Sequence, residues 1–187
     1  MKQLGFLLII AVFIFSVFDT NGQCFQLGGK ELVKAGTGNR TKGILGTLYF
    51  ATLYVPQELK GKPAKEVIEA DRPMSVMMHI YSRLLTRERF TDAVNEGFVK
   101  ASTTGYPTEK KDAFLKLFDS IEINKGDVIY LNYVPGEGLS PSYIPQGKGD
   151  AKLLGTIAGL EFKKALFAIW LGPNPVQESL KKALLGN

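Results

Sequence analysis

Two helical patterns lie in residues 153–187, LLGTIAGLEFKKALFAIWLGPNPVQESLKKALLGN, on either side of a Gly-Pro-Asn-Pro turn. Apolar residues recur at helical spacing in both patterns, so each helix has one face to bury. Asn174 is expected to cap the second helix, with Pro175 in its first position. The apolar residues at this spacing are Phe162, Ala165, Leu166, Ile169 and Trp170 in the first pattern and Val176, Leu180, Ala183 and Leu184 in the second.

Segments rich in β-branched and aromatic residues precede these helices and predict strands. Ile44–Val55 (ILGTLYFATLYV) is the longest, and both of its faces are largely apolar, so we expect it to be covered on both sides. Ser75–Tyr81 and Asp127–Val134 have the same character, whereas Lys30–Lys34 and Ala151–Ile157 are weaker candidates.

Two further helical patterns lie between the strands. Residues 90–98 follow Thr86, a candidate N-cap, and residues 113–121 follow Pro107. The resulting order of strands, a short helix, a strand, two helices, strands and two helices predicts an α+β fold rather than alternating βαβ units. A largely antiparallel sheet with helices on one face satisfies this order, and a cleft can form between its layers.

Residues 1–22 have the character of a secretory signal peptide. The apolar run Leu4–Phe18 is shorter than the roughly 20 residues of a membrane span. We therefore expect cleavage, no stable membrane span afterwards, and an exported protein, periplasmic or secreted, with one domain over residues 23–187. The alternatives are an uncleaved membrane anchor and a lipid anchor on Cys24, although no lipobox precedes that cysteine.

Composition and charge exclude several classes of protein. The chain is 45% apolar, as is usual for a globular protein, and its single cysteine cannot form an internal disulfide. The net charge of +5 is dispersed, and the lysine pairs 110–111, 163–164 and 181–182 fall on polar faces of helical patterns, where we expect solvation. Because no basic stripe alternates with aromatic residues, no nucleic-acid partner is predicted.

Few residues of the chain can carry catalysis. There is one histidine and one cysteine, and the motifs of metal sites, acyl transfer and nucleotide binding are absent from the sequence. We therefore predict no cofactor and no metal, and assign no catalytic residue. His79 lies in an apolar strand candidate, where a buried, hydrogen-bonded structural histidine is expected. Gly36, Gly38 and Gly43 lack the strand–loop–helix context of a phosphate-binding loop.

Arg40 and Tyr49 are the candidate ligand-binding residues. Arg40 lies in AGTGNRTKG, between two strand candidates, and is either a solvated turn residue or an arginine at the mouth of an apolar cleft. In the second case Tyr49 supplies another donor from the strand's interior face, beside a guanidinium fork that matches a carboxylate. Such a cavity suits a monocarboxylate with a long apolar tail.

Six segments, in order along nearly the whole chain, resemble blocks of the chalcone isomerase-like family. The resemblance implies an open-faced β-sandwich, in which a large antiparallel sheet carries a layer of helices. The segments are GTGNRTKG (36–43), LYFATLYVP (48–56), LLTRERFTDAVNEGF (84–98), KGDVIYLNYVPGEG (125–138), GTIAGLEFKKALFAIWLG (155–172) and NPVQESLKKALLG (174–186).

The resemblance implies one of two branches, isomerases that close a flavanone ring or non-catalytic binders. Arg40 matches the arginine that stabilises the enolate in the isomerases, but Phe90 and Gly97 stand where those enzymes carry a tyrosine and an asparagine. Arg40 and Tyr49 match instead the pair that holds the carboxylate in the fatty-acid-binding branch. The resemblance therefore favours a binder of a fatty acid or similar apolar carboxylate. The alternatives are an intramolecular lyase of the chalcone isomerase type, and an envelope interaction protein with a vestigial cleft.

Overall fold

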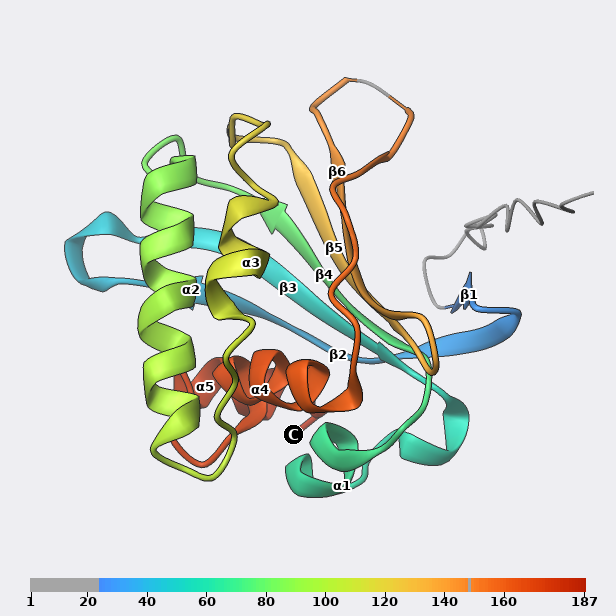
Figure 1. Ribbon diagram of the computed structural model, residues 1–187. Coiled ribbons are helices and arrows are strands. Elements are labelled where there is room, and N and C mark those ends of the chain that lie inside the picture. The colour runs from blue at the N-terminus through green and yellow to red at the C-terminus, as the bar shows by residue number, and fades with distance from the viewer. Residues whose placement is uncertain (1–23, 148) are drawn as a thin grey trace, which may run out of the picture.

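A computed structural model describes residues 24–147 and 149–187, and its main feature is an antiparallel sheet of seven strands in chain order (Figure 1). The predicted signal peptide, residues 1–22, lies outside the described residues. The strands are β1 (Cys24–Leu27), β2 (Lys30–Thr41), β3 (Thr47–Val55), β4 (Met74–Ile80), β5 (Val128–Val134), β6 (Gly138–Ile144) and β7 (Lys152–Leu153). The helices are α1 (Ala64–Glu69), α2 (Arg87–Ser102), α3 (Lys111–Lys116), α4 (Leu160–Leu171) and α5 (Glu178–Leu184), with one-turn 3₁₀ helices at Gly43–Leu45 and Gln57–Leu59.

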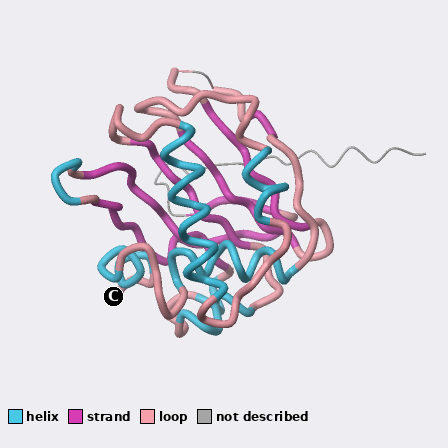
Figure 2. Tube along the Cα trace, turned by 60° about the vertical axis from the view of Figure 1, so that its left-hand side comes forward, coloured by secondary structure: helices cyan, strands magenta, loops and turns pink. Residues whose placement is uncertain are grey.

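The helices lie against one face of the curled sheet, which confirms the predicted α+β class (Figures 1 and 2). α4 is the centre of this layer, because it packs against both α1 and α2. This position explains why the helix is apolar almost all round rather than on one face. Its Phe162 is fully buried, with its ring 5.8 Å from Phe98 of α2 and 5.3 Å from Phe114 of α3.

The opposite face of the sheet is covered only in part. Phe25 and Leu32 of the β1–β2 hairpin form a small second core there with Tyr54, and the rings of Phe25 and Tyr54 lie 5.2 Å apart. The cover ends before Phe50, which is 38% exposed. The expectation that both faces of this segment are covered is therefore correct near Tyr54 and wrong near Phe50. The segment's first residues are also not strand, because Gly43–Leu45 forms a 3₁₀ turn.

His79 is exposed, and the prediction of a buried structural histidine is wrong. It is paired with Phe50 of β3 and Val128 of β5 in the sheet. Its side chain belongs to the same partly covered face as Phe50, beyond the reach of the β1–β2 hairpin. The apolar neighbours of His79 in sequence, Met78 and Ile80, point the other way into the main core because successive residues of a strand alternate between faces.

Lys163 is fully buried, so the prediction of solvation for this lysine is also wrong. Its Nζ donates to the main-chain carbonyls of Val67, Ile68 and Ala70 at 2.9, 2.7 and 2.9 Å. These carbonyls lie at the C-terminal end of α1, where a helix has no internal donors for them. Burial lowers the pKa of Lys163 to about 7, the charge of Lys164 lowers it too, and Asp71 raises it.

The glycines of β2 have a packing role. A Cβ on Gly36 would meet the main chain of α5 at Ala183, and a Cβ on Gly38 would lie 2.7 Å from the Ala183 side chain. α5 therefore lies directly on β2, closer than any side chain on these two residues would permit. The predicted start of α5 is wrong, because the helix begins at Glu178 rather than at Pro175.

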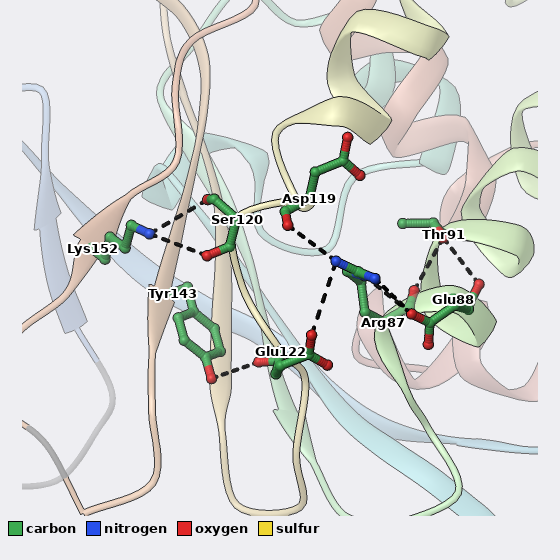
Figure 3. A network of polar contacts seen from close by, with 8 residues as sticks. All are labelled: Arg87, Glu88, Thr91, Asp119, Ser120, Glu122, Tyr143 and Lys152. Atoms are coloured by element: carbon green, nitrogen blue, oxygen red, sulfur yellow. Dashed lines mark hydrogen bonds and ion pairs between the residues drawn. The ribbon is translucent and has the colours of Figure 1, made fainter.

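The start of α2 is fixed to the segment that leads into β5 (Figure 3). Thr86 is the predicted N-cap, and its side chain accepts a hydrogen bond from the main-chain N–H of Arg89. Arg87 donates to the carbonyl of Asp119 at 3.0 Å and lies 4.0 Å from the Glu122 carboxylate. Tyr143 of β6 donates to the carbonyl of Glu122 at 2.8 Å, which holds this segment on the sheet. α2 is thereby held across the sheet at a defined position.

Within the described residues, no helix has the length and apolarity needed to cross a membrane.

Candidate functional site

Arg40 and Tyr49 stand directly opposite one another on the paired strands β2 and β3. Opposite residues of an antiparallel pair have their side chains on the same face. An irregularity in the pairing between Arg40 and Thr41 ends the regular ladder just after this pair. Arg40 is therefore a strand residue rather than the turn residue of the first alternative, and the structure brings it together with Tyr49.

A cavity of about 320 Å³ lies beside this pair, between the β2–β3 hairpin, α2 and the end of α4. Arg40 and Tyr49 both line it, so they share a site as well as a strand pair. The volume is at the lower end of the range of ligand pockets, about 300–1,000 Å³. The apolar residues of its wall include Leu48, Leu85, Phe90, Val94, Ile169 and Val176.

The guanidinium of Arg40 is held from one side by the segment between α4 and α5. Its Nη1 donates to Oε1 of Gln177 at 3.1 Å and to the carbonyl of Thr41 at 2.6 Å. Gln177 is itself fixed, since it accepts from the main-chain N–H of Thr41 at 2.9 Å and donates to the carbonyl of Asn39 at 3.1 Å. Among the described residues, Nε and Nη2 of Arg40 have no hydrogen-bond acceptor, so this edge of the fork remains for a ligand.

The Tyr49 hydroxyl is oriented by Trp170 of α4. Trp170 Nε1 donates to the hydroxyl oxygen at 2.9 Å. The tyrosine proton is therefore free to be donated to a ligand, because the oxygen acts as an acceptor toward Trp170. Burial raises the pKa of Tyr49, while the bond from Trp170 and the charge of Arg40 lower it, and the net shift is upward. The phenol thus stays protonated at neutral pH.

The cavity wall on α2 carries no side-chain donor at Phe90 or Gly97, although both residues line it. Phe90 is 3% exposed, with its ring 5.0 Å from that of Phe118, so it belongs to the core. A Cβ on Gly97 would lie 2.5 Å from Cγ2 of Ile169. The space that a side chain would need at position 97 is therefore filled by α4.

Sequence reasoning missed two residues that shape this site, Trp170 and Gln177. The apolar spacing placed Trp170 on the buried face of a helix, so it was expected only as a core residue. Nothing in the sequence pattern indicated that its indole would donate to a tyrosine on a strand. Gln177 had no signal, since it follows Arg40 by 137 positions. Among the described residues no group of three or more His, Cys, Asp or Glu side chains could hold a metal ion.

The model of the family described as chalcone isomerase-like matches residues 21–186. The chain belongs to the chalcone isomerase-like family. Among solved structures, the chain is similar to a fatty-acid-binding protein of Arabidopsis thaliana, with a TM-score of 0.62 and 19% sequence identity over 91% of this chain and 95% of that one. No protein with a curated description matches the sequence.

The likeness to this chalcone isomerase-like structure extends to the whole architecture. Both chains are covered almost completely, so the seven-stranded sheet and its helical layer are those of the family's fold. At 19% identity the likeness concerns the fold, and the chemistry of the site has to come from the residues of this chain.

Proposed function

We propose that this chalcone isomerase-like protein is a non-catalytic binder of a long-chain fatty acid or a similar apolar carboxylate. The observation that carries the proposal is the pairing of Arg40 with Tyr49 at a cavity that also has an apolar wall, formed by residues such as Leu48, Phe90 and Ile169. The free edge of the guanidinium and the tyrosine proton can both reach one carboxylate. The ligand class of the Arabidopsis protein supports the same choice.

The energetics of such a ligand fit the site. Each CH₂ that leaves water for the apolar wall contributes about 0.8 kcal/mol. A charge-assisted hydrogen bond from Arg40 contributes more than the neutral one from Tyr49. The head group therefore fixes the orientation, while the tail supplies most of the affinity.

The lyase alternative has weaker support. A developing enolate needs several fixed donors, and each one that is lost typically costs about 10²–10³ in rate. Phe90 and Gly97 offer none, and Ile169 occupies the space beside Gly97. The interaction-protein alternative predicts a pocket that takes up no ligand, which the following experiment tests.

Calorimetric titration of laurate and palmitate against the wild type and two variants tests the proposal. We expect Arg40→Ala to weaken binding by about 2–4 kcal/mol and Tyr49→Phe by about 0.5–1.5 kcal/mol. Arg72→Ala and Tyr106→Phe are matched controls, because neither residue lines the cavity. Equal affinity of Arg40→Ala and wild type would place the carboxylate elsewhere, and a folded wild type that binds no fatty acid would refute the function.

Mass spectrometry of lipid extracted from natively purified protein would identify the ligand itself. The wild type should retain a carboxylate-bearing lipid that Arg40→Ala loses.

We also propose that the protein is exported after cleavage of residues 1–22. The support is the short apolar run Leu4–Phe18 and the small residues that follow it. Intact-mass measurement of the mature protein should show the loss of about 22 residues. Retention of Leu4–Phe18 would favour a membrane anchor instead.

A further inference from the structure

The mouth of the pocket carries two exposed aliphatic side chains. Ile44 forms the tip of the β2–β3 hairpin and is fully exposed, while the adjacent Leu45 lines the pocket. Figure 2 shows the 3₁₀ turn Gly43–Leu45 standing out from the body of the molecule. Leu84, in the connection between β4 and α2, is 44% exposed and lines the same pocket. Single exposed apolar residues are ordinary, but these two flank one opening from different parts of the chain.

The segments that carry these residues are positively charged. Residues 39–46 contain Arg40 and Lys42, residues 82–86 contain Arg83, and neither segment contains an aspartate or a glutamate. Lys42 and Arg83 are exposed.

The wall of the pocket on α2 has both signs of charge. Arg89 and Lys100 are the cations there, and Asp92 and Glu96 are the anions. The excess of positive charge is therefore concentrated at the hairpin tip and the Leu84 connection, which are also the apolar parts of the mouth.

We propose that this mouth docks on a lipid bilayer that contains anionic lipids. The inference rests on the proposed function, because it supplies the route by which an apolar ligand enters. Ile44 and Leu84 insert at the boundary between head groups and acyl chains, and Lys42 and Arg83 lie against lipid phosphates. Apolar side chains beside cations are the combination that binds such an interface. A fatty acid then passes between the bilayer and the cavity without crossing water.

A second protein surface fits this feature less well. A stable protein interface buries about 800 Å² on each partner. The feature is a one-turn tip with one fully exposed large apolar side chain, Ile44, flanked by a separate connection. A narrow apolar projection with cations beside it can insert into a fluid, anionic bilayer, but it is too small to form a stable interface with a folded protein.

Co-sedimentation with lipid vesicles tests the docking surface. The vesicles are phosphatidylcholine alone, or equal parts of phosphatidylcholine and phosphatidylglycerol. We expect the wild type to bind the anionic vesicles at least about tenfold more tightly than the neutral ones, with a loss at high salt. Ile44→Asp and Leu84→Asp should each weaken that binding about tenfold or more. Leu153→Asp is the matched control, because Leu153 is 55% exposed on β7, at the edge of the sheet farthest along the strand order from the β2–β3 hairpin.

Three results would overturn the inference. They are equal binding to both kinds of vesicle, wild-type binding by Ile44→Asp, and a wild-type dimer that Ile44→Asp converts to monomers in light scattering. The last would show that a second copy covers the tip.

Titration of laurate without vesicles separates this inference from the proposed function. Ile44→Asp should bind laurate like the wild type, since Ile44 does not line the cavity. A wild type that sediments with anionic vesicles but binds no laurate would refute the function and leave the docking surface in place. A wild type that binds laurate but does not sediment with vesicles would refute the docking surface and leave the proposed function in place.

Discussion

Replacement of Lys163 by methionine tests how the buried lysine contributes to stability. Methionine has a similar length and no charge, so the variant removes the ammonium group with little change in packing. It also removes three hydrogen bonds, from Nζ to the carbonyls of Val67, Ile68 and Ala70. The carbonyls of Val67 and Ile68 stay buried, and within the part of the chain that the structure describes all three carbonyls lose the side-chain donor that caps the end of α1.

The magnitude follows from two opposing contributions. Taking an ammonium out of water costs several kcal/mol, while each hydrogen bond to a charged group contributes about 1.5–3 kcal/mol. In the wild type the three bonds offset only part of the desolvation, because burial still lowers the pKa of Lys163 to about 7. In the variant the unpaired carbonyls each cost about 1–3 kcal/mol, reduced by relaxation of the short helix. We expect Lys163→Met to lower the free energy of unfolding by about 2–4 kcal/mol, because the three unpaired carbonyls outweigh the desolvation cost that the variant removes.

Urea denaturation followed by circular dichroism measures the effect. Lys164→Met is the matched control, because Lys164 is partly exposed and should change the stability by no more than about 0.5 kcal/mol. A Lys163→Met variant with the wild-type denaturation midpoint would show that the carbonyls do not depend on the ammonium, and the reasoning would fail.

The same residue predicts a pH dependence. The pKa of Lys163 is about 7 in the folded protein and about 10.4 when the chain is unfolded. Between these values the unfolded chain binds a proton that the folded one does not, so the stability rises with pH, by at most about 1.4 kcal/mol per pH unit. Below about pH 7 both states are protonated, and this contribution to the slope disappears. Lys163→Met should lack the rise relative to the wild type.

Three other predictions concern the pocket. Gly97→Ala should lower the free energy of unfolding by about 1–3 kcal/mol, because its Cβ would meet Cγ2 of Ile169. Gly97→Ala should cost less when it is introduced into an Ile169→Ala variant, which lacks that Cγ2 atom. Gln177→Ala should weaken laurate binding in calorimetry, but less than Arg40→Ala does, because the guanidinium loses a hydrogen-bond partner and is still present. An effect as large as that of Arg40→Ala would contradict the view that Gln177 only positions the guanidinium. Cyclisation of a chalcone, followed by absorbance, should be absent, or slower than in a plant isomerase by a factor of about 10²–10³ for each missing donor. A rate within about tenfold of the plant enzyme would contradict the interpretation that Phe90 and Gly97 replace catalytic donors.

The sequence predicts those elements whose burial is periodic. Strands β3, β4 and β5 and helices α2 and α4 were expected within a few residues of their bounds, because their apolar faces repeat at the period of a strand or a helix. β6 was missed because GLSPSYI contains a proline and two serines and has no continuous apolar face. Of Ala151–Ile157, only Lys152–Leu153 is strand, joined by an isolated bridge between Ile157 and Leu139.

The candidate site was predictable only where it depends on neighbours in the chain. Arg40 and Tyr49 flank one hairpin, so their pairing follows from local geometry. Gln177 and Trp170 reach them from 137 and 121 positions away, and such contacts depend on how whole helices dock. Lys163 shows the same limit, since its carbonyl partners lie more than 90 positions earlier. A lysine in an amphipathic pattern is normally solvated.

Close helix approaches permitted by glycines decide the character of the pocket. Gly36 and Gly38 let α5 lie on β2, which places Gln177 beside Arg40 and holds one edge of the guanidinium. Gly97 lets α2 approach α4 until Ile169 closes the wall, so no polar side chain can stand there. The result is an arginine fixed at the strand pair and an apolar stretch of wall where α2 meets α4, beside charged residues of α2 that also line the pocket. This asymmetry suits a carboxylate with a tail, whereas stabilisation of an enolate needs donors that converge on the reacting atoms. The close packing that requires glycine at these positions therefore supports the proposed binding function rather than the lyase alternative.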